Sequence, residues 1–73
     1  MIDYRKVLGD NVRAARAELG VSQEELGLDT GIDRTYISGI ERGKRNPSLK
    51  VIVEIAEQLM TTPGELLNQA EQD

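Results

Sequence analysis

Hydrophobic residues recur at helical spacing in two long stretches of the chain. In the first stretch they stand three and four positions apart and form one stripe: Tyr4, Leu8, Val12, Ala15 and Leu19. Such a stripe is typical of an amphipathic helix, so we predict a helix over residues 4–19 that Gly20 ends. A second stripe after Ser48 predicts another helix with these inward residues: Leu49, Ile52, Ile55, Ala56 and Leu59.

Two short helices are predicted between these stripes, over residues 23–29 and 34–42. Ser22 can cap the first helix and Asp33 can cap the second. Gly31 lies between them and can adopt the left-handed conformation that a sharp turn requires. Because helices this short are unstable alone, we expect the longer helices to hold them in place.

A fifth helix is predicted near the end of the chain. Thr62 can cap it, and Pro63 suits its first position because the missing N–H is not needed there. Leu66 and Leu67 follow within this helix, and the polar residues 68–73 are expected to fray. Five helices and no credible strand predict one compact all-α domain over residues 1–73.

The helix over residues 34–42 has two contrasting faces. Ile37 and Ile40 are three residues apart, so both lie on one side of the helix. The opposite side is polar, cationic and free of acids: Arg34, Thr35, Ser38, Gly39 and Arg42. We therefore expect this face to contact an anionic partner.

Composition restricts the classes of function. The 73 residues are 38% hydrophobic, which suffices for one small domain. The chain has no Cys and no His, so thiolate metal sites are excluded and the commonest general base is missing. No apolar run approaches the roughly 20 residues of a membrane span, and no signal pattern is present. We expect a cytoplasmic protein that is not an enzyme and needs no cofactor.

The charge is unevenly distributed, although the net charge is only -4. Residues 33–50 carry five cations and two anions, whereas residues 51–73 carry five anions and no cation. A phosphate backbone responds to the local face rather than to the total. The basic middle of the chain therefore suits nucleic acid, and we expect the acidic end to point away from it.

The central stretch resembles the phage-repressor and Cro-type helix-turn-helix family, also called the XRE family. The resemblance rests on one register of residues: Gln23, Leu26, Gly31, Ile37, Ile40, Glu41, Gly43 and Pro47. The string DRTYISGIERGKRNPS adds the family's helix end and following loop. Membership implies a five-helix lambda-repressor-like fold over about residues 8–67, with the helix-turn-helix at the second and third helices.

The resemblance implies that the third helix enters the major groove of double-stranded DNA. Arg34, Thr35 and Ser38 would then meet base edges, where an arginine can donate to guanine. Gly39 occupies a place where many relatives carry a base-reading side chain, so it either lets the backbone approach or gives up a contact. The expected backbone contacts are Gln23, Tyr36, Arg42, Lys44, Arg45 and Asn46. As alternatives, Tyr36 is a partly buried aromatic, and the cations form a solvated cluster at a helix end.

Two structural features also follow from the family pattern. Arg16 is expected to pair with Glu41 and so to fasten the first helix to the third. Because one such domain binds weakly, relatives usually act as two-fold dimers on palindromic sites. The candidate dimer residues, each of which could instead fill the core, are Val51, Val53, Met60, Leu66 and Leu67.

Three classes of function compete at this point. The first is a homodimeric transcription regulator or repressor on a short palindromic operator, with DRTYISGIERG most similar to controllers of restriction-modification operons. The second is an antitoxin or adaptor whose main partner is another protein. The third, an enzyme, is disfavoured by the composition. No small-molecule ligand and no membrane partner are evident.

Overall fold

The computed structural model describes residues 1–69 and folds them into five helices with no strand among them. The helices are α1 (Tyr4–Leu19), α2 (Gln23–Thr30), α3 (Arg34–Glu41), α4 (Leu49–Gln58) and α5 (Pro63–Leu66). The all-α prediction is confirmed, and the predicted ends of the second and third helices are each wrong by one residue. Residues 70–73, part of the tail predicted to fray, lie outside the described residues.

The predicted caps form at the helix starts. The Ser22 hydroxyl accepts from the Glu25 N–H at 3.0 Å, and the Glu25 carboxylate accepts from the Ser22 N–H at 3.0 Å. Gly31 follows α2 with φ of 75° and turns the chain toward α3. These contacts satisfy backbone donors that a helix start leaves unpaired.

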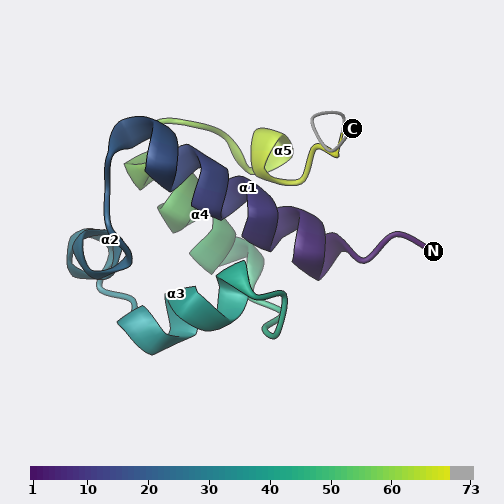
Figure 1. The fold of residues 1–73 in the computed structure, drawn as a ribbon, viewed down its shortest axis with the longest axis horizontal. Helices are drawn as coiled ribbons and strands as arrows, with labels where there is room; N and C mark the ends of the chain where they lie inside the picture. The colour runs from purple at the N-terminus through teal and green to yellow at the C-terminus, as the bar shows by residue number, and fades with distance from the viewer. Residues whose placement is uncertain (70–73) are drawn as a thin grey trace.

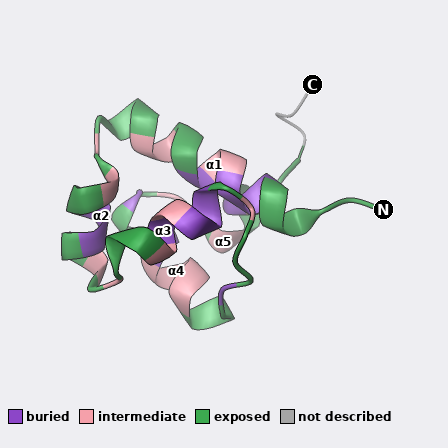
Figure 2. Cartoon of the chain, turned by 60° about the horizontal axis from the view of Figure 1, so that its bottom comes forward, coloured by how far each residue is buried: buried purple, intermediate pink, exposed green. Residues whose placement is uncertain are grey.

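The five helices surround one core (Figures 1 and 2). α1 crosses the molecule and packs on α3 and α5, while α2 packs on α3 and α4. The buried cluster draws on every helix: Leu8, Val12, Leu26, Ile37, Ile40, Ile55, Ala56, Leu59 and Leu66. Because α2, α3 and α5 have only eight, eight and four residues, this shared core is what holds them.

The predicted stripes are correct in their centres and wrong at their ends. Tyr4 and Leu19 are 51% and 43% exposed, and Leu49 is 69% exposed. All three lie in the terminal turns of α1 and α4. Val7, which the stripe left out, is buried instead. Periodicity identifies the inward face of a helix but not how far its neighbours extend along it.

Candidate nucleic-acid interface

One face of α3 is polar and open to solvent. Arg34 and Thr35 are exposed and Ser38 is half-buried. Asp33 caps the helix by accepting from the Thr35 N–H at 2.7 Å, and the Thr35 hydroxyl donates to the same carboxylate. These two bonds, the hydroxyl's first, hold the pKa of Asp33 below its ordinary value. The Thr35 hydroxyl proton is therefore used in the cap, which leaves the hydroxyl oxygen as an acceptor and the methyl group for an outside contact.

The start of α2 lies beside this face. A surface hollow of about 310 Å³ is lined by Gln23, Arg34, Thr35, Ser38 and Arg42. Four of these residues were predicted to contact DNA from α3, and the fifth is the predicted contact from α2. The structure thus brings together one amide, two hydroxyls and two cations on a single surface.

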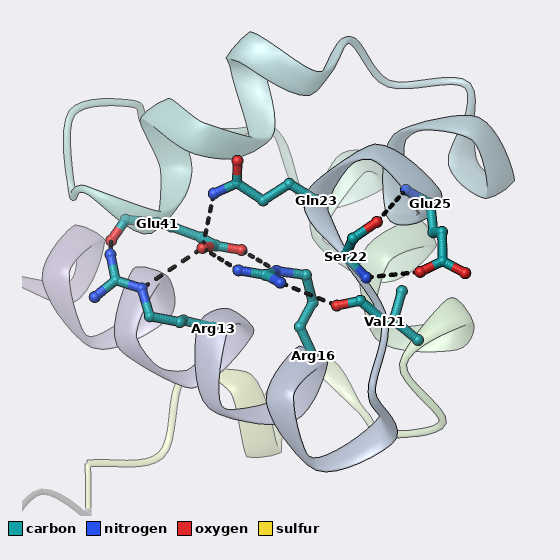
Figure 3. A network of polar contacts seen from close by, with 7 residues as sticks. All are labelled: Arg13, Arg16, Val21, Ser22, Gln23, Glu25 and Glu41. Atoms are coloured by element: carbon teal, nitrogen blue, oxygen red, sulfur yellow. Dashed lines mark hydrogen bonds and ion pairs between the residues drawn. The ribbon is translucent and has the colours of Figure 1, made fainter.

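The second half of α3 is fastened by Glu41 (Figure 3). Its side chain is 1% exposed and faces α1 and α2. Arg16 donates to both carboxylate oxygens, from Nε at 2.6 Å and from Nη2 at 2.8 Å. Gln23 Nε2 adds a third donor at 3.1 Å, and the Arg13 Nε lies 3.6 Å away. The predicted Arg16–Glu41 pair is present between α1 and α3, and Gln23 extends the network to α2.

The electrostatics of this network favour the ionised pair. Burial raises the pKa of Glu41, but hydrogen bonds from Arg16 and Gln23 and the nearby arginine charges outweigh burial and leave the pKa lowered. The hydrogen bond to Glu41 in turn raises the pKa of Arg16. Arg16 also donates to the Val21 carbonyl at 2.9 Å. Within residues 1–69, no buried side-chain polar atom lacks a hydrogen-bond partner.

Gln23 therefore has a structural role besides the predicted phosphate contact. One amide hydrogen is used on Glu41, while the second hydrogen of the amide remains for another acceptor. An external acceptor placed near Gln23 would be coupled to the buried carboxylate. The same residue thus serves both the packing of α2 against α3 and the polar surface.

Two residues that anchor α3 were not anticipated from the sequence. Arg13 donates from Nη2 to the Glu41 carbonyl at 3.3 Å and so caps the end of α3. Gly9 lies where a Cβ atom would stand 2.4 Å from the Ile40 carbonyl oxygen. Gly9 therefore allows α1 to cross directly over the end of α3. A glycine inside an otherwise regular helix was the available signal.

The segment after α3 carries the remaining predicted backbone contacts. Lys44, Arg45 and Asn46 are all exposed. The Arg45 guanidinium carbon lies 5.2 Å from the centroid of the Tyr36 ring, a distance typical of a cation–π contact. Tyr36 itself is partly buried against the core, as in the alternative given for it above.

Gly39 lies beneath a neighbouring side chain. It is buried, and a Cβ atom there would stand 2.9 Å from Arg45 Cγ. The Arg45 side chain thus lies across Gly39 on its way to Tyr36. The neighbouring arginine covers Gly39 in this structure, and the place of Gly39 among the base-reading residues stays a prediction.

The predicted dimer residues differ in exposure. Met60 is 83% exposed, whereas Val51, Val53 and Leu67 are partly buried. Leu66 is only 2% exposed and belongs to the core, so its assignment to a dimer surface is wrong. The reason is that α5 packs on α1, where Asn11 Nδ2 donates to the Leu66 carbonyl at 2.8 Å.

Residues 1–69 contain no cluster of three or more acidic or other ligating residues that could hold a metal ion. None of their helices combines the length and the apolar character needed to cross a bilayer.

Comparison with known proteins gives a consistent assignment. Residues 12–66 match the HTH_3 helix-turn-helix family model. The chain is 43% identical over 67 residues to control protein C.BamHI of Bacillus amyloliquefaciens, covering 90% of this chain and 83% of that one.

Solved structures agree with the sequence comparison. The hypothetical transcription factor NHTF from Neisseria superposes with a TM-score of 0.88 at 39% identity, over 94% of this chain and 79% of that one. The restriction-modification controller C.Esp1396I, solved as a tetramer with its natural 35 base-pair operator, gives 0.76 at 32% identity, over 89% and 96% of the two chains. The chain belongs to the HTH_3 (XRE) helix-turn-helix family of DNA-binding transcriptional regulators, which are not enzymes.

Proposed function

We propose that the protein is a homodimeric regulator that inserts α3 into the major groove of a short two-fold symmetric operator. One observation carries the proposal: the polar face of α3 and the start of α2 form one surface, lined by two cations and no acid. A major groove accepts one α-helix. The buried half of α3 supplies the rigid support that a base-reading face needs.

Arg34 is the leading base-reading residue. Its side chain is exposed at the start of α3 and has no hydrogen-bond or ion-pair partner within residues 1–69. Its fork of donors matches the O6 and N7 acceptors of guanine, a contact worth about 1–3 kcal/mol of discrimination. Thr35 would present its methyl group to a thymine, and Ser38 its hydroxyl to an adjacent base edge.

The phosphate contacts would come from both sides of α3. Gln23 offers its second amide hydrogen and the α2 N-terminus offers backbone N–H groups to one strand. Arg42, Lys44 and Asn46 follow the end of α3 and would contact phosphates on the other side of the groove. Arg45 and Tyr36, which already touch each other, would meet the backbone as one unit.

The dimer would form through α4 and the segment that joins it to α5. Met60 is the most exposed large apolar side chain there, and Val51, Val53 and Leu67 supply partly exposed neighbours. Related C.Esp1396I was solved as a tetramer on its operator, which supports assembly of more than one copy on DNA. Two recognition helices would then face half-sites about one helical turn apart.

A narrower role follows from the relatives. Several of them are control proteins, and the solved relatives C.AhdI and C.Esp1396I are restriction-modification controller proteins. We therefore propose that the protein acts in the cytoplasm as an autoregulatory controller whose operator lies in its own operon. A cognate site found upstream of its own gene would support this role.

Selection of bound duplexes from a random pool tests the proposal. At about 150 mM salt, where loose backbone binding is suppressed, wild-type protein should enrich a two-fold symmetric site. Arg34→Gln, which keeps a polar side chain but removes the guanidinium fork, should lose the enriched guanine. A pool that stays random with folded protein would contradict the proposal. Stable capture of a protein partner in place of DNA would favour the adaptor alternative.

A further inference from the structure

A second basic surface lies outside the face described above, at the junction of α1 and the segment after α3. An open hollow of about 560 Å³ has five basic side chains on its walls: Arg5, Lys6, Arg13, Arg42 and Lys44. Arg42 also lines the hollow beside Gln23. The two hollows therefore share one lining residue, and an extended polyanion that contacts Arg42 lies beside both.

The backbone holds the two walls of this hollow together. A Cβ atom on Gly43, which has φ of 72°, would stand 3.4 Å from Lys6 Cα. Gly9 brings the next turn of α1 onto the end of α3. The first turns of α1 are thus fixed beside residues 42–44 (Figure 1). The basic side chains lie close together because α1 packs on the end of α3.

The carboxyl end of a helix normally repels an anion, but here its carbonyl groups are covered. The carbonyl oxygens of Ser38, Gly39 and Ile40 accept from the N–H groups of the three residues that follow Glu41. The Glu41 carbonyl accepts from Arg13. The last four carbonyl groups of α3 are therefore paired, and the cationic side chains of Arg42 and Lys44 line the hollow beside them.

The acids near the hollow are already paired, and Asp3, which lines it, also caps α1 by accepting from the Arg5 backbone N–H at 3.1 Å. Asp3 lies 3.5 Å from Arg5, and Asp10 lies 2.8 Å from Lys6, both pairs at the surface. Exposed pairs of this kind contribute little and exchange readily. Glu41 is neutralised by Arg16. Arg42 and Lys44 have no side-chain partner within residues 1–69, so the hollow keeps a positive excess.

We propose that this hollow is a second phosphate site, which holds a DNA backbone phosphate outside the stretch contacted by α3. Lys6 and Arg5 would leave Asp10 and Asp3 and donate to the phosphate together with Lys44. The inference rests on the proposed docking of α3, because only that docking brings the backbone past Arg42. The site would add affinity without adding base preference.

Salt-dependent binding to the selected operator tests this site. The variant Arg5→Gln/Lys6→Gln should bind about fivefold more weakly near 0.15 M salt, and the slope of log K against log salt should fall by about 0.9 for the lost contact. Asp10→Asn, which frees Lys6, should bind more tightly than wild type. Preference for operator over scrambled DNA should stay unchanged in both variants.

A charge-matched control separates a local contact from a general loss of charge. Gln58→Glu lowers the net charge by one, as does each of the single variants Arg5→Gln and Lys6→Gln with which it is compared, and it lies at the end of α4 away from α3 (Figure 1). It should change binding by less than about twofold and leave the salt slope as in wild type. Thermal melting by circular dichroism should show all variants folded, because the altered pairs are exposed.

The possible outcomes separate the two proposals. If wild type prefers the operator but Arg5→Gln/Lys6→Gln retains the wild-type slope, the second phosphate site is overturned and α3 docking stands. If wild type does not distinguish operator from scrambled DNA, α3 docking fails and the site fails with it. A saturating titration of the Gly43 and Lys44 amide signals by millimolar inorganic phosphate would show a small-anion site instead.

Discussion

The two halves of α3 differ in their exposure to solvent. The first half begins with the exposed Arg34 and Thr35, whereas the second half ends with Ile40 and Glu41, each no more than 3% exposed. Figure 2 shows this change from exposed to buried along the helix. A side chain that reads bases must be open to solvent and must not be bound to other residues of the protein. It can be positioned accurately only if the backbone that carries it is fixed. The eight residues of α3 combine exposed side chains with a fixed backbone.

Glu41→Ala should have the largest effect on stability, because it removes the carboxylate that fixes the second half of α3. Arg16 would keep a charge that is 16% exposed and lose its partner, a change that typically costs about 3–5 kcal/mol. For so small a domain this approaches the whole free energy of unfolding. Circular dichroism with urea should show the loss.

Glu57→Ala is the matched control for that prediction. Glu57 is exposed on α4, so its removal should change the free energy of unfolding by less than about 0.5 kcal/mol. A Glu41→Ala protein that unfolds at the urea concentration of wild type would show that the network does not hold α3.

Acidification should gradually weaken the Glu41 network that fixes the second half of α3. Since the folded-state pKa of Glu41 lies below its ordinary value, its contribution to stability is present above that ordinary value. The contribution is lost as pH falls through the folded-state pKa. The stability difference between wild type and Glu41→Gln should therefore shrink on acidification. Urea unfolding from pH 7 to about pH 3 measures it, and a difference that stays constant would contradict the lowered pKa.

Gly39→Ala probes the boundary between the halves and should have the smallest effect on stability. Alanine improves helix propensity by up to about 1 kcal/mol, but its Cβ would displace Arg45 from Tyr36 and forfeit about 0.5–1 kcal/mol. The two terms nearly cancel. In an Arg45→Ala background the same change should stabilise by nearly 1 kcal/mol.

The double-mutant cycle for Gly39 and Arg45 has a direct readout. Urea unfolding gives the coupling energy, and the NMR signals of the Tyr36 ring report whether the guanidinium has left. Equal effects of Gly39→Ala in both backgrounds would mean that Arg45 does not rest on this glycine.

Local sequence signals predicted the helices well, because caps and turns act over three or four residues. Ser22, Gly31, Asp33 and Thr62 marked boundaries that the structure reproduces. The burial of Leu66 and the exposure of Leu49 were not predictable in this way. Both depend on where another helix ends in space, which no local pattern encodes.

The candidate site shows the same limit. The residues on the exposed face of α3 follow from the helical period, so they could be named from the sequence. The cover of Arg45 over Gly39 and the cap from Arg13 join residues that are distant along the helix or the chain. Such contacts follow only from the assembled fold.

The most direct test of the division within α3 is the effect of Arg34→Ala on two quantities measured together. The ratio of affinities for operator and scrambled DNA should fall by about 1–3 kcal/mol in free-energy terms, while the free energy of unfolding stays within about 0.5 kcal/mol of wild type. That pair of results would establish a free base-reading half on a fixed support. An unchanged affinity ratio, or a lower ratio accompanied by lost stability, would contradict it.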